Sequence, residues 1–419
     1  MNSYLYVVLG LLIAEYLLHL GIDLVNLRYV KTSIPDEFKD WYNELKYAES
    51  QQYLIDTTRF ELIQSSIQTP LLIGFILFGG FQWADDLARS AGGGLICTGL
   101  VFTGILVLFA HVFQLPFRIY NTFVLEAKYG FNLTKPLTFI VDVFKGLLLT
   151  VLIGGPVFAG LLWFFSRAGQ VAWIYSWIAV ILIQFLLIYI APVFIMPLFN
   201  TFSPLEEGDL KKSISEYAKK EGFSLMGIFK MDGSRRSTKS NAYFTGFGRW
   251  RRIVLFDTLI AKHTIDELIS ILAHEVGHYQ LRHIQKTLIA SVLSTGFMFY
   301  ILSLFITRVN LYAAFGLEMN LVGGYAPIYA GFVFFGFLYT PISMGVGLAQ
   351  KILSRKHEFE ADEFAVQTYG NPDAMVDALK KLSVDNLSNL SPHPIKVFLE
   401  YSHPPVLERI LSIRKLQTM

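Results

Sequence analysis

His274-Glu275-Val276-Gly277-His278 lies in a stretch whose hydrophobic residues recur with helical spacing, beginning at Thr264 and Glu267, which can form a capping box. Two histidines four residues apart on a helix share one face, about 5–6 Å apart at Cβ, so both imidazoles can bind one Zn²⁺. Glu275 lies about 100° around the helix, where its carboxylate can act on a metal-bound water without binding the metal. The pattern therefore predicts a zinc hydrolase site of the metallopeptidase type.

Zinc needs a third protein ligand, and catalytic sites keep a further position for water. Glu358 is the best candidate, because the segment 354–365 consists mainly of helix-forming residues and contains no Gly or Pro. Asp362 follows four residues later on the same helical face, where it can accept a hydrogen bond from a metal-binding histidine and fix its tautomer. Without the pentapeptide, such a charged segment would be read as a solvated helix face.

The composition places this site in a membrane protein. Of the 419 residues, 53% are hydrophobic and 16% are charged, whereas soluble domains average about 25% charged residues. Seven stretches are long and apolar enough to span a bilayer, and we predict a mainly α-helical, polytopic fold. The predicted spans are 4–27, 65–83, 94–115, 139–165, 173–195, 288–306 and 325–348.

Basic residues predict the orientation of these spans. They concentrate in the first loop (Arg28, Lys31, Lys39, Lys46, Arg59) and the third loop (Arg118, Lys128, Lys135), whereas the second, fourth and sixth carry only Arg89, Arg167 and Arg308. The positive-inside rule places the first and third loops in the cytoplasm. The amino terminus is then outside, and the insert after the fifth span and the C-terminal tail, which hold the two parts of the metal site, are both cytoplasmic.

The chain divides into a membrane domain with five spans (1–200), a cytoplasmic metalloprotease insert (201–285), spans six and seven (286–350) and a cytoplasmic C-terminal region (351–419). In the insert, 205–221 is typical of an amphipathic helix, and 241–245 with 252–256 of a β-hairpin. An edge strand beside a peptidase site can bind an extended peptide through its backbone. A purely structural hairpin packed under the metal helix is the alternative.

Further stretches accompany the pentapeptide and the 354–365 segment. They are Ser240-Asn241-Ala242-Tyr243-Phe244, the segment 252–259, Ser402-His403-Pro404-Pro405 with Glu408-Arg409, and, upstream, the segments 126–132 and 197–205. Together they resemble the type I CaaX prenyl proteases of peptidase family M48, which are integral-membrane zinc proteases of the endoplasmic reticulum and their bacterial relatives. The resemblance covers nearly the whole chain.

This resemblance implies a seven-helix barrel around a large intramembrane chamber, with a small zinc-metallopeptidase domain at its cytoplasmic end. The matching metal ligands are His274, His278 and Glu358, the general base is Glu275, and Asp362 is the carboxylate behind the ligands. The resemblance also implies that His403 stabilises the oxyanion, that Arg409 supports this arrangement, and that Asn241 and Ala242 bind the substrate backbone.

We therefore expect a Zn²⁺-dependent endopeptidase that acts on C-terminal tails of prenylated or membrane-associated substrates. Two alternatives remain: a quality-control zinc protease that cleaves misfolded, unprenylated membrane proteins, and a non-enzymatic transporter or scaffold with a structural metal site. The short outer loops and the final residues 415–419, which lack a dilysine-like signal, favour a bacterial inner membrane over the endoplasmic reticulum. We further expect a monomer in contact with membrane lipid, and a net charge of +2 gives no nucleic-acid signal.

The remaining histidines and the single cysteine carry less information. His19 and His111 lie in predicted spans and suit a polar chamber or a transport pathway, although no internal repeat supports transport. His263, His283, His357 and His393 are expected to be structural or surface groups. His283 is close to His278 in sequence but on the opposite face of an uninterrupted helix. Cys97 has no intramolecular disulfide partner.

Overall fold

The computed structural model describes residues 2–223, 225–246, 251–317 and 327–417. Within these residues it contains seven helices long and apolar enough to cross a membrane, which confirms the predicted number. They are Ser3–Arg28, Glu44–Leu77, Leu95–Lys128, Pro136–Arg167, Gly169–Leu198, His283–Phe305 and Ile328–Tyr369.

Most of these spans are built from one or two regular helices. They are α1 (Ser3–Arg28), α2 (Glu44–Leu77), α4 (Leu95–Tyr120) continued by α5 (Glu126–Lys128), α6 (Pro136–Leu149) continued by α7 (Gly155–Arg167), α8 (Ala172–Ile190), α12 (His283–Phe305) and α14 (Ile328–Tyr369). The last is much longer than the predicted span, because its final turns, with Glu358 and Asp362, extend beyond the apolar stretch.

The second span differs from the prediction at both ends. It was expected over 65–83, but α2 begins at Glu44 and ends at Leu77, and Trp83 belongs to a separate helix, α3 (Gly80–Ser90). Gly79 ends α2 in the left-handed conformation (φ 74°), which glycine adopts without a steric penalty. A Cβ at Gly80 would lie 2.3 Å from the Phe75 ring, so both glycines are required for this turn.

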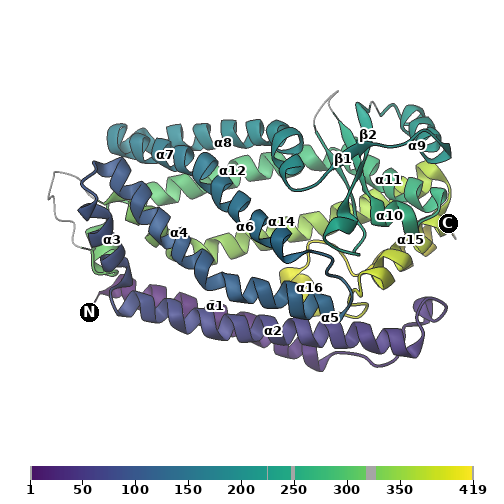
Figure 1. Ribbon diagram of the computed structural model, residues 1–419, viewed down its shortest axis with the longest axis horizontal. Helices are drawn as coiled ribbons and strands as arrows, with labels where there is room; N and C mark the ends of the chain where they lie inside the picture. The colour runs from purple at the N-terminus through teal and green to yellow at the C-terminus, as the bar shows by residue number, and fades with distance from the viewer. Residues whose placement is uncertain (1, 224, 247–250, 318–326, 418–419) are drawn as a thin grey trace.

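The spans run along the long axis of the molecule (Figure 1). The amino terminus and α3 lie at one end, and the sheet, α9 (Asp209–Lys220), α11 (Ile265–Gln280), α15 (Pro372–Asp385) and the carboxyl terminus lie at the other. Contacts connect neighbouring helices around the molecule: α1 packs on α2 and α14, α4 on α7 and α14, and α8 on α7 and α12.

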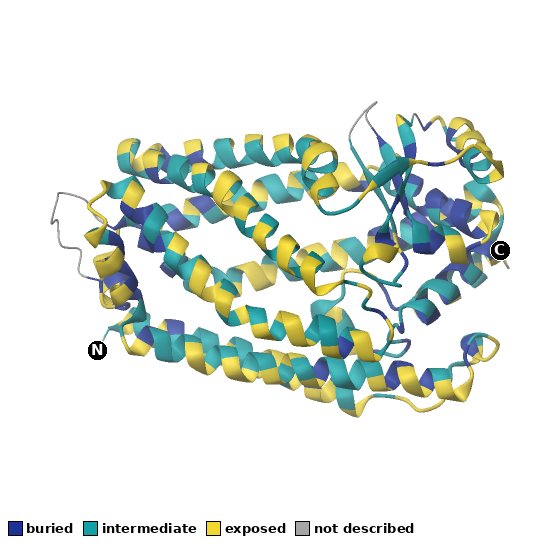
Figure 2. Ribbon diagram, viewed as in Figure 1, coloured by how far each residue is buried: buried dark blue, intermediate teal, exposed yellow. Residues whose placement is uncertain are grey.

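Buried residues gather at the two ends, as Figure 2 shows. One hydrophobic cluster, which includes Phe81, Phe102 and Phe334, joins α3, α4 and α14, and another, which includes Leu255 and Leu272, joins the sheet to α11. Between them, the most apolar windows of the spans are only 0% to 17% buried. Helices packed as a solid bundle would bury one face, so the low burial supports the expected chamber.

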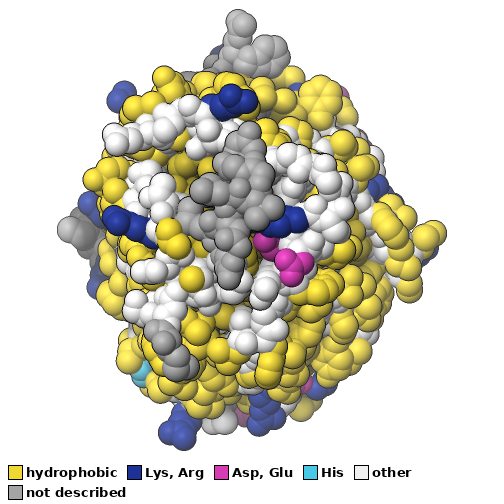
Figure 3. Space-filling model, turned by 90° about the vertical axis from the view of Figure 1, so that its left-hand side faces the viewer, with side chains coloured by type: hydrophobic (Ala, Val, Ile, Leu, Met, Phe, Trp, Pro, Cys, Tyr) yellow, Lys and Arg dark blue, Asp and Glu magenta, His cyan; other side chains and the backbone are white. Residues whose placement is uncertain are grey.

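The end opposite the sheet presents a mainly hydrophobic surface. Figure 3 views this end, and hydrophobic side chains gather around much of its rim, with only a few Lys, Arg, Asp and Glu side chains among the described residues. Soluble monomers rarely expose apolar surface so extensively, which agrees with a membrane location for the helical part.

The sheet at the other end has four strands in the order β1-β2-β4-β3. They are β1 (Phe202–Pro204), β2 (Gly227–Met231), β3 (Ala242–Thr245) and β4 (Arg252–Phe256). Strands β3 and β4 pair antiparallel, which confirms the predicted hairpin, and β3 is an edge strand. The three-residue β1 and five-residue β2 were not predicted. The predicted amphipathic helix is present as the shorter α9.

The described residues also contain four further α-helices. They are α10 (Asp257–Lys262), α16 (Pro394–Glu400) and α17 (Val406–Gln417), with the short α13 (Val309–Ala313) near α1 and α14. Helix α17 packs on α14 and α15, so the C-terminal region reaches back to the helix that carries Glu358.

Candidate metal centre

Helix α11 begins with the predicted capping box. Thr264 Oγ1 accepts a hydrogen bond from the Glu267 amide at 3.3 Å, and the Glu267 carboxylate accepts one from the Thr264 amide at 3.0 Å. Such caps stabilise a helix by about 1 kcal/mol. Lys381 from α15 also binds the Glu267 carboxylate at 2.7 Å. The start of the helix that carries both histidines is therefore fixed by its own backbone and by a neighbouring helix.

Gly277 lets α11 approach α14 closely. A Cβ at this position would lie 3.2 Å from the Cα and the carbonyl oxygen of Ala361, closer than most real Cβ contacts. Since α11 and α14 pack along their length, this close approach brings Glu358, on α14, to the two histidines of α11. Gly277, the residue just before His278 in the pentapeptide, therefore has a packing role.

The structure brings the three predicted ligands together. The Nε2 atoms of His274 and His278 are 3.1 Å apart, and the Glu358 carboxylate oxygens lie 3.5 Å from His274 Nε2 and 3.3 Å from His278 Nε2. Tetrahedral zinc with bonds of about 2.0–2.1 Å would separate its ligand atoms by about 3.4 Å. The donor set and its spacing therefore fit a zinc ion.

Asp362 and Arg409 hold His274 from behind. The Asp362 carboxylate lies 2.7 Å from His274 Nδ1 and pairs with the Arg409 guanidinium through two contacts of 2.7 and 2.6 Å. Burial alone would lower the pKa of His274, but the Asp362 carboxylate outweighs it and raises this pKa to about 9. When Nε2 binds a metal and gives up its proton, the remaining ring proton is on Nδ1, where the Asp362 carboxylate accepts it.

Glu275 and His403 lie beside these ligands. Glu275 follows His274 on α11, is half-buried, and has no hydrogen bond or ion pair within the described residues, so its carboxylate is free to accept a proton. His403 lies in the segment before α17, and its side chain is 65% exposed with Nε2 3.4 Å from the Glu358 carboxylate. Both predicted residues are therefore at the ligand cluster, and His403 approaches it from the solvent side.

His283 also reaches the cluster, contrary to the sequence expectation. On an uninterrupted helix, five residues would place it about 140° around from His278. However, α11 ends at Gln280, and Arg282 adopts the left-handed conformation (φ 59°) before α12 begins at His283. The turn at Arg282 brings His283 Nδ1 to 3.0 Å from His278 Nδ1. No local sequence signal marks this break, because Arg282 is neither Gly nor Asn.

Asn241 and Ala242 lie at the free edge of the sheet. The amide of Phe256 donates to the Asn241 carbonyl, so Asn241 and Phe256 form a hydrogen-bonded pair. Such pairs alternate in an antiparallel ladder, so the backbone groups of Ala242 and Phe244 point away from β4. A pocket of about 810 Å³ runs from Tyr243 and Phe244 to His278, which places this edge beside the metal ligands.

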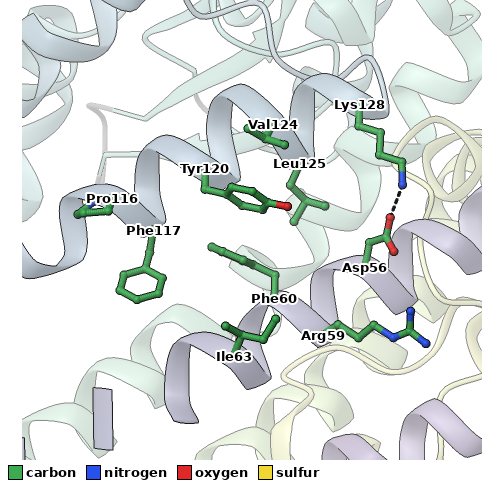
Figure 4. A pocket seen from close by; sticks show the side chains of 10 residues that line it. All are labelled: Asp56, Arg59, Phe60, Ile63, Pro116, Phe117, Tyr120, Val124, Leu125 and Lys128. Atoms are coloured by element: carbon green, nitrogen blue, oxygen red, sulfur yellow. Dashed lines mark hydrogen bonds and ion pairs between the residues drawn. The ribbon is translucent and has the colours of Figure 1, made fainter. Parts of the chain in front are cut away.

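A second pocket lies in the helical wall and does not include the metal ligands (Figure 4). Its lining comes from α2 and from the helix continued by α5, and the Lys128 ammonium bridges the two at 2.5 Å from the Asp56 carboxylate. The other lining residues are Arg59, Phe60, Ile63, Pro116, Phe117, Tyr120, Val124 and Leu125. The pocket therefore lies between two spans that this ion pair joins, and its lining does not include the metal ligands.

Comparisons with known proteins cover almost the whole chain. A family model described as CAAX prenyl protease N-terminal, five membrane helices, matches residues 25–201, and one for peptidase family M48 matches residues 204–417. A CAAX prenyl protease 1 homolog from Arabidopsis thaliana is 32% identical over 97% of this chain and 96% of its own. CAAX prenyl protease 1 from Saccharomyces cerevisiae is 34% identical over 91% and 89%.

A solved structure shows the same fold. The crystal structure of S. mikatae Ste24p superposes with a TM-score of 0.93 at 31% sequence identity, over 99% of both chains. The fold described above is therefore shared with this protein along the full length.

Proposed function

Since the chain belongs to the CAAX prenyl proteases of peptidase family M48 and is an integral-membrane metalloprotease, we propose that it cleaves C-terminal tails of prenylated or membrane-associated proteins at a zinc ion. His274, His278 and Glu358 hold the ion. The observation that carries this proposal is the spacing of 3.1 to 3.5 Å among their nitrogen and oxygen atoms, which suits tetrahedral zinc.

The surrounding residues supply the proton transfers. When bound, zinc polarises the scissile carbonyl and lowers the pKa of a water molecule. Glu275, which makes no hydrogen bond within the described residues and interacts electrostatically with Arg409, takes the proton from the attacking water and passes it to the leaving amine. His403 donates a hydrogen bond to the oxyanion, and its exposure lets it move towards a bound substrate. Asp362 and Arg409 orient His274.

The edge strand β3 positions the peptide. The outward backbone groups of Ala242 and Phe244 can pair with an extended substrate once the Asn241 side chain, whose Oδ1 accepts from the Ala242 amide at 2.9 Å, gives up that amide. The adjoining pocket is lined by Phe185, Ile188 and other apolar side chains of α8, as well as by β3 and α12. A substrate with a hydrophobic tail therefore finds backbone partners and apolar surface on the same side of the metal centre.

We assign the metal centre to the cytoplasmic side and the amino terminus to the outside, on the charge of the loops. The bacterial inner membrane remains a prediction that rests on the short outer loops, and the relatives named above come from a plant and from yeasts. We treat the protease as a monomer in contact with lipid.

The test is a cleavage assay with purified full-length protein in detergent, using a fluorogenic farnesylated CaaX peptide and its unprenylated twin. We expect cleavage of the farnesylated peptide to be faster, to stop with a chelator, to return with Zn²⁺, and to be lost in Glu275→Gln. Glu363→Gln, on the exposed side of α14, is the matched control and should retain full activity.

The outcomes separate the alternatives. Equal cleavage of both peptides would favour the quality-control protease. Full activity of Glu275→Gln would contradict the proposed chemistry, because Glu275 is the only residue assigned to accept the proton of the attacking water. Cleavage that survives metal removal would show that the metal centre is not the catalytic site.

A further inference from the structure

His278 has its own supporting contacts, separate from those of His274. Its Nδ1 atom lies 3.0 Å from His283 Nδ1, and His283 Nε2 lies 2.9 Å from the Glu360 carboxylate. We propose that His283 and Glu360 are positioning residues that fix the tautomer and orientation of His278 for metal binding. This inference rests on the proposed metal site.

The hydrogen-bond pattern has one consistent arrangement. If His278 binds the ion through Nε2, its ring proton is on Nδ1 and must be donated to His283 Nδ1. His283 is then neutral, with its own proton on Nε2, and donates it to the Glu360 carboxylate. Each of the two short contacts is then a hydrogen bond with one donor and one acceptor. Removing the acceptor at His283 would leave the His278 tautomer unselected.

The packing around His283 keeps this arrangement rigid. His283 is only 3% exposed, and its ring stacks on His357 at 3.9 Å between centroids with 9° between the planes. Glu360 comes from α14, two residues after Glu358, and Lys356 lies 3.6 Å from its other oxygen. The two histidine ligands of α11 are thus each connected to a carboxylate of α14, one through Asp362 directly and the other through His283.

A second metal ion is the competing explanation, since ligand atoms of His283, His357 and Glu360 lie within 4.8 Å of one another. An imidazole nitrogen binds a metal in the plane of its ring. The stacked rings of His283 and His357 are almost parallel, so their planes do not meet at a shared ion. A metal on His283 Nε2 would also displace the proton that Glu360 accepts. The geometry therefore favours hydrogen-bonded support over a second ion.

The test is zinc affinity rather than activity alone. Full-length wild type, His283→Phe and His283→Asn would be stripped of metal in detergent and titrated with Zn²⁺ against a competing fluorescent chelator. Phe keeps the stacking on His357 and removes the acceptor, and we expect about 10- to 100-fold weaker zinc binding. Asn places its carbonyl oxygen near the Nδ1 position and should recover most of the affinity. Melting of the metal-free proteins should be unchanged.

Two further variants act as controls. His357 stacks on His283 and takes no part in the proposed chain of hydrogen bonds. His357→Phe keeps the stacking, so this variant should bind zinc like wild type. Glu360→Ala removes the last acceptor at a partly exposed position that should tolerate the change, and we expect a smaller loss than in His283→Phe. It keeps the test decisive if His283→Phe does not fold.

Several results would overturn the inference. Wild-type affinity in both His283→Phe and Glu360→Ala would show that the contacts are only structural. Two bound ions in wild type, reduced to one in His283→Phe, would favour a second metal site. His283→Asn as weak as His283→Phe would exclude the acceptor as the cause. A wild type that binds no zinc would instead overturn the proposed metal site, and the inference with it.

Discussion

Arg409 pairs with two buried carboxylates, and its loss would leave both without this partner. It pairs with Asp362 at 2.6 Å and with Glu358 at 3.3 Å, and all three side chains are nearly buried. Breaking a buried ion pair by removing one partner costs about 3–5 kcal/mol. We expect Arg409→Gln to lower the free energy of unfolding by this amount, measured by denaturant unfolding of the detergent-solubilised protein.

Arg414, on the same helix α17, is the matched control. Its side chain is 41% exposed and pairs at 2.9 Å with Asp373, itself exposed. Exposed ion pairs contribute about 0–1 kcal/mol, so Arg414→Gln should lower the free energy of unfolding by no more than about 1 kcal/mol. Equal losses in the two variants would show that burial of the Arg409 pairs does not determine their contribution.

At the residue scale, the sequence predicted correctly which side chains of the two helices meet. The one side chain that it misplaced, His283, follows an unpredicted change in backbone conformation. His274, His278, Glu358 and Asp362 lie as helical spacing required, since each pair is four residues apart on an unbroken helix. His283 was placed on the wrong face because the left-handed Arg282 interrupts the helix. A conformation that costs energy and is imposed by tertiary packing has no local sequence signature.

Among the elements, β3 offers the sharpest test, because its two backbone edges differ. The amide of Ala242 points to the free edge, where it donates to Asn241 Oδ1 at 2.9 Å until a substrate carbonyl replaces that acceptor, whereas Tyr243 lies in a hydrogen-bonded pair with Val254. Proline removes an amide hydrogen without breaking a ladder when the amide faces outward. We expect Ala242→Pro to raise KM about tenfold or more for the CaaX peptide, with zinc affinity and melting temperature unchanged.

Tyr243→Pro is the control, because it removes an amide that pairs with β4 and should lower the melting temperature instead. If Ala242→Pro cleaves the peptide with wild-type KM, the edge does not bind substrate. The hairpin itself could be predicted because two short apolar runs flank Gly246 and Gly248. Strands β1 and β2 could not, because they pair with each other across α9 and no turn signal links either strand to a neighbouring run.

For the whole molecule, the structure brings together the loops that the charge pattern had grouped on one side of the membrane. The basic first loop reaches the metal-site end, where Phe38 and Tyr42 pack on Met375 and Ile410. The third loop reaches the same end, with the Leu133 amide donating to the Arg236 carbonyl at 2.9 Å. The positively charged loops, the insert and the C-terminal helices therefore lie on one side of any membrane that the spans cross. The sequence predicted this grouping because seven is an odd number of spans.

Which side that is can be measured with single cysteines, and Cys97→Ser gives a background without cysteine in one substitution. Lys39→Cys lies in the loop between α1 and α2 at the metal-site end, and Ser90→Cys lies at the end of α3, at the opposite end of the molecule. In right-side-out vesicles, we expect a membrane-impermeant maleimide to label Ser90→Cys at once and Lys39→Cys only after permeabilisation. Inside-out vesicles should reverse the order. The opposite pattern would place the metal centre outside, and because the basic loops lie at that end, it would make this chain an exception to the positive-inside rule.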